Sequence, residues 1–343
     1  MLTAEYVRGR GIEVSAAESE PPGPGEVQIA VAFTGICGTD LHIAHGAMDE
    51  RTGERRVIGH EMSGTVAAVG EGAEQWAPGT PVTVMPLLWC GECPTCLAGN
   101  RHICERLVFV GIDAPGSLQG LWNVPQEIVI ELPGDISLRD AALVEPVAVA
   151  HHDVERGKVA PEDFVVVVGG GPVGLLIAVV AQRRGARVVV VELDDFRRAV
   201  IESVGIPTLD PSGRDVTELV ADMTGGAGAD VTFEVSGTQP GLTTALAALR
   251  PRGRMVAVGI HPQPREVDLK RIFWKELEIF GARVYERSDY DAAIELVASG
   301  AIPADAIISR VVPLAEAPDA FAALAAGGAV MKVLIDMSAG AES

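Results

Sequence analysis

The spacing of hydrophobic and polar positions changes near residue 150. Before that point, apolar residues alternate with polar ones in short runs such as EVQIAVAFTGI (26–36), GTVAAVGEG (64–72) and TPVTVMP (80–86), each flanked by glycine or proline. Alternation with a period of two, interrupted by turn residues, is typical of strands with one buried face. The pattern predicts a β-rich domain over residues 1–150.

From residue 163 the pattern becomes strand, glycine-rich turn, helix and strand. FVVVVGGGPVGLLIAVVAQRRGARVVVVEL (164–193) is followed by the helical DDFRRAVIESVG (194–205) and by two apolar strands, DVTFEVSG (230–237) and GRMVAVGI (253–260). This alternation predicts an α/β domain with a doubly wound parallel sheet over residues 151–286. The last segment, 287–343, contains two helical stretches that each precede a strand, and we expect it to return to the first domain.

Composition and charge narrow the functional classes. A chain of 343 residues is long enough for two domains, and 48% of its residues are hydrophobic. Its net charge is −20 and it has only four lysines, so a nucleic acid partner is not expected. We find neither a leader pattern nor an apolar stretch of the ~18 residues that a membrane span requires. We therefore expect a cytoplasmic protein that does not enter a membrane.

Four of the five cysteines lie in CGECPTCLAGNRHIC (90–104). The spacing C-x2-C-x2-C-x7-C of Cys90, Cys93, Cys96 and Cys104 allows four thiolates to converge on one ion, as in structural zinc sites. The spacing alone leaves an iron–sulfur cluster open as the alternative. Disulfides are disfavoured in a cytosolic chain. His102 is expected to be an ordinary loop residue.

The fifth cysteine, Cys37, lies in GICGTDLH (35–42), and His60 and Glu61 follow in VIGHEMSG (57–64). A thiolate, an imidazole and a carboxylate with one open position form the ligand pattern of a catalytic zinc. Each residue alone has an ordinary explanation, because a lone cysteine is usually a small buried hydrophobe. The three together predict a second metal site.

A glycine-rich turn follows the first apolar strand of the second domain. Gly169, Gly171 and Gly174 form G-x-G-x-x-G ahead of a helix, a pattern that allows a dinucleotide pyrophosphate to approach the helix N-terminus. Pro172 and Val173, within the same turn, are expected to contact the cofactor.

The next strand ends in Glu192, 18 residues after Gly174, where a carboxylate accepts hydrogen bonds from ribose hydroxyls. Glu192 therefore favours NAD over NADP. Arg197 is expected near the same nucleotide. Its presence favours NADP instead, because an arginine can bind a 2′-phosphate.

Together with ALVEPVAVAHH (142–152) and GARV, these motifs make the whole chain similar to the zinc-dependent medium-chain dehydrogenase/reductase family. The similarity is greatest to its polyol branch, which includes sorbitol, butanediol and threonine dehydrogenases. The resemblance implies a GroES-like catalytic domain formed by both chain ends around an inserted Rossmann domain. It also implies two zinc ions per chain, hydride transfer from an alcohol to NAD, and a homo-oligomer, either a dimer or a tetramer.

The resemblance also implies roles for single residues. Cys37 and His60 correspond to catalytic-zinc ligands, with Glu61 and Glu145, the latter expected on a strand, as carboxylates that alternate between ligating and supporting the metal. Thr39 and His42 correspond to a proton relay. Cys90, Cys93, Cys96 and Cys104 correspond to the structural zinc site.

One motif departs from the family, and two other protein classes stay open. GSLQGLW (116–122) places Gly120 and Leu121 where the family has glutamate and tyrosine, so the identity of the alcohol is not specified. A zinc-free quinone reductase of the same fold would need neither metal set. A non-enzymatic zinc-binding adaptor would not need the glycine-rich turn.

Overall fold

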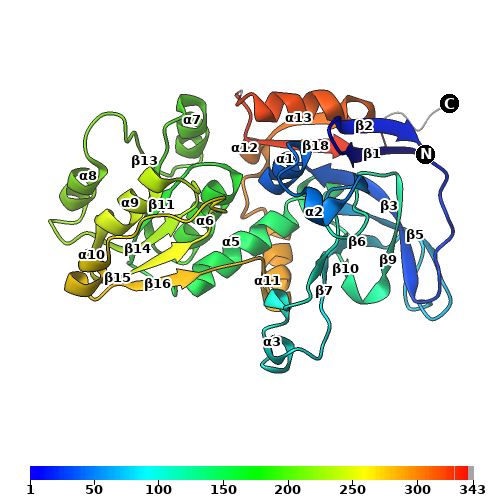
Figure 1. The fold of residues 1–343 in the computed structure, drawn as a ribbon, viewed down its shortest axis with the longest axis horizontal. Helices are drawn as coiled ribbons and strands as arrows, with labels where there is room; N and C mark the ends of the chain where they lie inside the picture. The colour runs from blue at the N-terminus through cyan, green and yellow to red at the C-terminus, as the bar shows by residue number, and fades with distance from the viewer. Residues whose placement is uncertain (328, 339–343) are drawn as a thin grey trace. The chain divides into compact units, whose positions relative to one another are not determined.

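The computed structural model describes residues 1–327 and 329–338, and the chain divides into two compact units. Unit 1 comprises Met1–Glu145 together with Glu286–Ser343, and unit 2 comprises Pro146–Tyr285. Both ends of the chain therefore belong to unit 1, and unit 2 is an insertion. In Figure 1, the N-terminal strands (blue) and the C-terminal elements (red) lie together in unit 1.

The largest sheet of unit 1 has seven strands in the order β10-β6-β5-β3-β18-β17, and β9 also pairs with β3. Its strands are β3 (Glu26–Gly35), β5 (Glu61–Val69), β6 (Pro81–Val84), β9 (Leu121–Pro125), β10 (Val129–Glu131), β17 (Ile308–Pro313) and β18 (Lys332–Asp336). Alternating residues Val27, Ile29 and Val31 of β3 are buried in the core, as the period of two predicts.

The rest of unit 1 consists of short elements around this sheet. A second sheet has the order β2-β1-β4, and β7 pairs with β8. These strands are β1 (Leu2–Val7), β2 (Gly11–Ala16), β4 (Arg55–Val57), β7 (Leu87–Leu88) and β8 (Val108–Phe109). The helices are α1 (Gly38–Ala44), α2 (Asp49–Thr52), α3 (Pro94–Leu97), α4 (Leu138–Ala141), α11 (Arg287–Ala298), α12 (Ala304–Ile307) and α13 (Ala317–Ala325), with 3₁₀ turns η1 (Arg101–Ile103), η2 (Gln126–Ile128) and η3 (Leu314–Glu316).

The C-terminal segment completes the sheet that the N-terminal strands begin. Strand β18 pairs antiparallel with β3 and parallel with β17. Tyr290 of α11 is buried, and its hydroxyl donates a hydrogen bond to the carbonyl of Val84 at 2.9 Å. Residues more than two hundred positions apart in sequence thus form one hydrophobic core.

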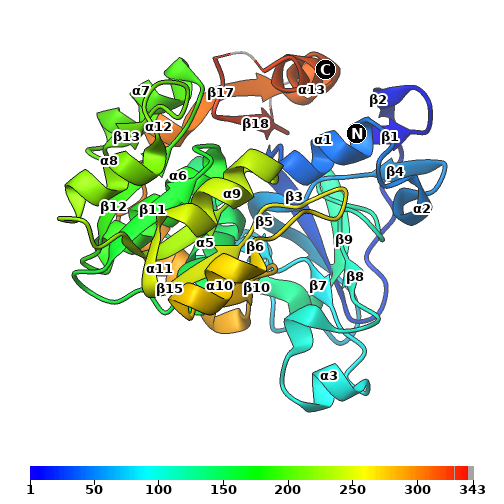
Figure 2. The same cartoon turned by 60° about the vertical axis from the view of Figure 1, so that its left-hand side comes forward.

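Unit 2 contains a six-stranded parallel sheet in the order β13-β12-β11-β14-β15-β16. Its strands are β11 (Phe164–Val168), β12 (Arg187–Val191), β13 (Thr208–Leu209), β14 (Ala229–Glu234), β15 (Leu249–Ala257) and β16 (Glu278–Gly281), and its helices are α6 (Pro172–Arg183), α7 (Asp195–Ser203), α8 (Val216–Met223), α9 (Gln239–Ala248) and α10 (Leu269–Lys275). Every residue of β11 is buried, as expected of a strand with helices on both faces. Figure 2 shows the sheet of unit 2 with its helices around it. The predicted fold class is confirmed.

One detail of the sequence prediction is wrong. The segment around Glu145 is not a strand but the start of α5 (Val144–Arg156), because its apolar residues follow a helical period and Pro146 lies in the first turn, where proline is tolerated. The β-rich region also contains the short helices α1 to α4, which are too brief to produce a recognisable period. Within the described ranges, no helix has both the length and the apolar character needed to cross a bilayer.

Candidate metal and cofactor sites

The register of two neighbouring strands brings Cys37 next to His60 and Glu61. Strand β3 ends at Gly35, and Gly35 pairs with Glu61 at the start of β5. A side chain at Gly35 would overlap with the carboxylate of Glu61, so glycine is needed there. Sγ of Cys37, one imidazole nitrogen of His60 and one carboxylate oxygen of Glu61 all lie within 4.8 Å of one another. The structure therefore brings three of the four predicted catalytic-zinc residues together.

Asp40 lies beside both Cys37 and His60 in this site, and the sequence analysis missed it. Its side chain is fully buried at the start of α1, where one oxygen accepts a hydrogen bond from the amide of Cys37 at 2.9 Å. The other oxygen lies 3.6 Å from Nδ1 of His60. Carboxylates behind a metal-bound histidine commonly orient its ring in this way. The signal was present in GTDLH, three residues after Cys37.

The electrostatics of the site favour a bound cation. Burial alone lowers the pKa of His60, but the charges of Asp40, Cys37 and Glu145 and a hydrogen bond with Cys37 raise it well above its usual value. Burial raises the pKa of Asp40, and the charges of His60 and Lys332 with the hydrogen bond from Cys37 do not offset it. A divalent cation would neutralise this buried negative charge, so the donor set of sulfur, nitrogen and oxygen fits zinc.

Lys332 is the second residue that the sequence analysis missed. It is buried in β18, and its Nζ lies 2.7 and 2.6 Å from the two carboxylate oxygens of Glu61 and 3.1 Å from the carbonyl of Ile36. Burial lowers the pKa of Lys332, but the charge of Glu61, followed by those of Cys37 and Glu145, raises it overall. A lysine within the apolar run AVMKVLIDM was the available signal, because lysine is almost never fully buried without a partner.

The remaining residues predicted for this site differ in exposure. Glu145 is buried in the first turn of α5, and its charge acts on both His60 and Lys332. Thr39 is half-buried in the first turn of α1, whereas His42 is exposed in its last turn.

Phe109 contacts the ring of His60 edge-on, with 5.2 Å between the ring centroids.

The four clustered cysteines have the geometry of a tetrahedral zinc site. The Sγ atoms of Cys90 and Cys104 lie 3.5 Å apart, and those of Cys90 and Cys96 and of Cys93 and Cys104 lie 3.9 Å apart. Four sulfurs at ~2.3 Å from one zinc would be separated by about 3.8 Å. A cluster of four irons lies between its cysteines and holds them further apart. The distances therefore favour zinc over the iron–sulfur alternative.

Backbone amides stabilise thiolates in this loop. The amides of Cys93, Cys96 and Arg106 donate to the sulfurs of Cys90, Cys93 and Cys104 at 3.3 to 3.4 Å. Backbone amides lower the pKa of Cys90 to about 6, whereas burial raises that of Cys96 to about 12. His102, expected to be an ordinary loop residue, lies in the 3₁₀ turn η1 and is buried, with Nδ1 3.6 Å from a carboxylate oxygen of Glu286.

The glycine-rich turn of unit 2 follows β11. Gly169 has a φ of +109°, which only glycine adopts readily, and a side chain at Gly174 would overlap with the carbonyl of Gly169. A Cβ on Gly171 would meet nothing closer than Nη1 of Arg197 at 3.8 Å, so this position is open to a ligand. Pro172 and Val173 begin α6 directly after it. The three glycines thus have the spacing, and Gly169 and Gly174 also the close packing, that are typical of a dinucleotide-binding turn.

Glu192 lies beside this turn, immediately after β12. Its carboxylate accepts hydrogen bonds from the amides of Gly170, Leu193 and Asp194 at 2.7 to 2.9 Å. Nη1 of Arg197, on α7, lies 3.9 Å from the same carboxylate. The carboxylate of Glu192 is therefore held at the carboxyl end of β12. Arg197 is close enough to this carboxylate to pair with it.

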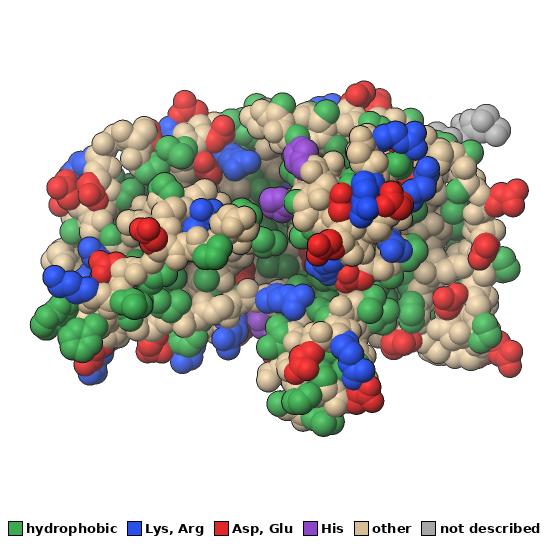
Figure 3. Space-filling view, viewed as in Figure 1, with side chains coloured by type: hydrophobic (Ala, Val, Ile, Leu, Met, Phe, Trp, Pro, Cys, Tyr) green, Lys and Arg blue, Asp and Glu red, His purple; other side chains and the backbone are tan. Residues whose placement is uncertain are grey.

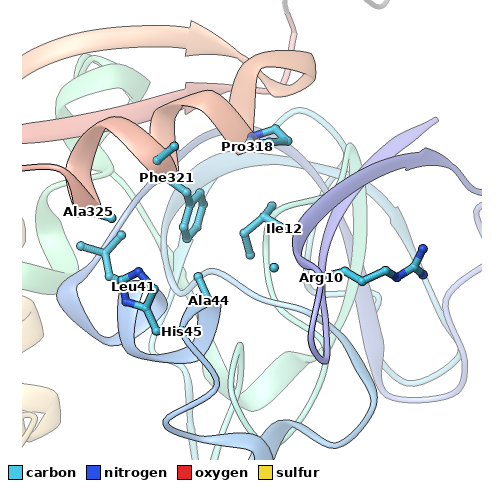
Figure 4. Close-up of a pocket in the computed structure, with 10 residues that line it drawn as sticks. Arg10, Ile12, Leu41, Ala44, His45, Pro318, Phe321 and Ala325 are labelled. Atoms are coloured by element: carbon cyan, nitrogen blue, oxygen red, sulfur yellow. The ribbon is translucent and has the colours of Figure 1, made fainter.

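The pocket shown in Figure 4 is separate from these sites. It is a hollow of about 260 Å³ in unit 1 between β2, α1 and α13, lined mainly by apolar side chains such as Ile12, Leu41 and Phe321. His45, to which the sequence analysis gave no role, lies on its wall. The pocket is not lined by any residue predicted to bind metal or cofactor.

Comparison with known proteins defines the class. Residues 23–134 match the model of the alcohol dehydrogenase GroES-like domain, and residues 172–299 match that of zinc-binding dehydrogenases. The chain therefore belongs to the zinc-binding dehydrogenases of the alcohol dehydrogenase superfamily, and it is an oxidoreductase.

Individual relatives cover nearly the whole chain. It is 45% identical to 2-dehydro-3-deoxy-L-galactonate 5-dehydrogenase of Pseudoalteromonas atlantica, over 99% of both chains. It is 32% identical to sorbitol dehydrogenase of Halalkalibacterium halodurans, over 95% of this chain and 96% of the relative. A crystal structure of a zinc-binding dehydrogenase from Sinorhizobium meliloti, bound to NADP, has a TM-score of 0.92 and 31% identity over 98% of each chain.

The two metal sets predict separable effects of mutation. We expect two zinc ions per chain by elemental analysis. Cys37→Ser should remove one zinc and abolish turnover, while the protein still folds and binds NADH. Cys93→Ser should remove the other zinc and lower thermal stability, because structural zinc contributes folding free energy. A wild-type protein with one zinc, lost in Cys93→Ser and kept in Cys37→Ser, would contradict the assignment of a catalytic metal to Cys37 and His60.

Proposed function

We propose that this chain is a zinc-dependent dehydrogenase that oxidises a secondary alcohol of a sugar acid with NAD as hydride acceptor. The observation that carries the proposal is the convergence of Cys37 with the buried His60 and Glu61, in a chain that also has a glycine-rich turn before a helix. The substrate class is supported by the 45% identity to a dehydrogenase named for a deoxy sugar acid. A zinc-free quinone reductase would need neither metal set, and an adaptor would not need the glycine-rich turn.

In this proposal Cys37 and His60 hold the catalytic zinc, and a carboxylate from Glu145 or Glu61 completes the site. Lys332 holds both oxygens of Glu61, so Glu61 ligates the metal only when that ion pair opens. We therefore assign Glu145 to the resting state. Zinc, when bound, supplies a Lewis acid for the alcohol, and NAD accepts the hydride.

The alcohol proton leaves through Thr39 and His42 in this proposal. Both lie on α1, immediately after Cys37, and the exposure of His42 allows its imidazole to pass a proton to solvent. His42→Ala should slow oxidation by about 10²-fold or more, most strongly at low pH, where hydroxide cannot replace the base. The pH dependence of kcat, with zinc content as the control, tests this. An unchanged profile would remove His42 from the reaction.

The function is tested by assaying the purified, zinc-loaded protein with NAD against 2-dehydro-3-deoxy-L-galactonate, sorbitol, butane-2,3-diol and threonine. We expect the highest kcat/KM with the sugar acid. NADH formation should disappear in His60→Ala while NADH binding, followed by fluorescence, persists. Turnover of the neutral polyols alone would refute the sugar-acid substrate. Inactivity with every alcohol would refute the proposed function.

Glu192 is proposed to select NAD. Its carboxylate would accept hydrogen bonds from the ribose hydroxyls and repel a 2′-phosphate, which should give NAD an advantage on the order of 10² in kcat/KM. Arg197 is the opposing influence, and the solved relative with NADP shows that this family also binds the phosphorylated cofactor. Glu192→Ala should reduce the preference, whereas Arg197→Ala should increase it. Equal use of NADP by the wild type would overturn the role of Glu192.

We also propose a homo-oligomer, supported by the apolar surface of unit 2. Phe273 and Trp274 of α10 are 73% and 70% exposed. Strand β16, which follows α10, is an edge strand, and its Ile279 is also exposed. Figure 3 shows hydrophobic side chains gathered over this end of unit 2. Such a patch beside an open edge usually contacts another chain. Light scattering should give a mass above 35.8 kDa that falls in Trp274→Glu; a monomeric wild type would contradict the proposal. The cytoplasmic location stays a prediction.

A further inference from the structure

A group of charged side chains in unit 1, Arg51, Arg56 and Asp113, has no part in the functions described above. We call it the arginine cluster. Arg51 of α2 donates two hydrogen bonds to Asp113, from Nε at 2.9 Å and from Nη2 at 2.7 Å. Partial burial raises the pKa of Asp113, but hydrogen bonds from Arg51 and from the amide of Phe109, with the charges of Arg51 and Arg56, lower it overall. Asp113 is therefore a carboxylate that is bonded to the guanidinium of Arg51 and lies within reach of the charge of Arg56.

The arginine cluster is connected to the metal site through one loop. Asp113 accepts a hydrogen bond from the amide of Phe109 at 2.8 Å, and the ring of Phe109 contacts His60. The same loop packs directly on the residue before His60, because side chains at Gly111 or Gly116 would overlap with the carbonyl of Gly59. Phe109 thus lies between a predicted zinc ligand and the arginine cluster.

The cluster carries one positive charge in excess. Arg51 and Arg56 contribute two cations, and Asp113 contributes one anion, in a chain whose net charge is −20. Nε of Arg56 is buried and has no hydrogen-bond acceptor among the described residues. A buried donor without an acceptor costs free energy, and charged donors cost more. Both observations indicate that an anion completes the cluster.

Arg56 is held in place by its strand. It lies on β4 directly opposite Tyr6 of β1, so the two side chains share one face of the sheet. The hydroxyl of Tyr6 bonds to Asp49 at the start of α2, the helix that carries Arg51. Arg55, the preceding residue, is exposed and pairs with Glu5. The strand therefore directs two adjacent arginines to different partners.

We propose that the arginine cluster is the subsite for the carboxylate of the substrate, with Arg56 as the group that binds it. The inference rests on the proposed function, because a sugar acid has a carboxylate at one end of the carbon chain whose alcohol reacts at the metal. Arginine binds carboxylates through parallel N–H donors, and Asp113 keeps Arg51 oriented beside it. The carbon chain would pass along Phe109 from the metal site to Arg56.

The test combines enzyme variants with a neutral substrate. Arg56→Met should lower kcat/KM for 2-dehydro-3-deoxy-L-galactonate by on the order of 10- to 10²-fold, mainly through KM, because uniform binding energy is lost. The primary amide of the same acid should be a poorer substrate for the wild type by a similar factor, and Arg56→Met should hardly affect it. Arg56→Lys should recover part of the loss. Arg55→Met is the matched control and should behave as the wild type, and zinc content and NADH affinity should stay unchanged in all variants.

Different outcomes separate this subsite from the function itself. If the wild type oxidises the acid and Arg56→Met does so equally well, or loses acid and amide activity alike, the subsite is refuted and the function stands. If the wild type neither oxidises the acid nor binds it by calorimetry in the presence of NADH, the subsite and the sugar-acid substrate both fail. Activity with neutral polyols then decides whether the dehydrogenase function remains.

Discussion

The buried ion pair between Glu61 and Lys332 joins residues 271 positions apart, and much of unit 1 depends on it. Glu61 begins β5 beside Cys37 and His60, and Lys332 begins β18, far away along the chain. Both side chains are almost fully buried, and each is the nearest opposite charge of the other. Breaking such a pair by removing one partner commonly costs about 3–5 kcal/mol, because the remaining charge stays buried. The pair therefore requires the C-terminal strand to return to the sheet of the N-terminal strands.

The same pair explains how a site with several acidic groups is tolerated. Cys37, Glu61, Glu145 and Asp40 all place negative charge near His60, in a region from which water is largely excluded. Lys332 compensates the charge of Glu61 in this structure, and a divalent metal would compensate others. The negative charges of the site would thus be compensated partly by the lysine and partly by the metal. With its charge compensated by Lys332, Glu61 could lie close to the metal without binding it.

Much of this arrangement could be predicted from sequence, and the exceptions have physical reasons. The cysteine spacing, the glycine-rich turn and the apolar strand before it are local patterns whose chemistry requires those residue types at those positions. Lys332 was missed because its meaning comes from a partner far away in sequence. Glu145 was placed on a strand because a short apolar run fits a strand and a buried helix equally well, and its periodicity alone does not distinguish them. Asp40 was overlooked although it lies three residues from Cys37, because a buried carboxylate on a short helix has no distinctive pattern.

The pairing of β18 with β3 also has a consequence for biosynthesis. Unit 2 is a continuous stretch of chain and can become compact as soon as it leaves the ribosome, whereas the central sheet of unit 1 lacks β17 and β18 until residues 308–336 have also been made. Contacts between distant residues form late because closing a long loop costs entropy. Until then, β3 has an unpaired edge and Glu61 lacks its lysine. We infer that the nascent protein matures from the middle outwards, which pulsed hydrogen exchange during refolding would register as protection of β11 before β3.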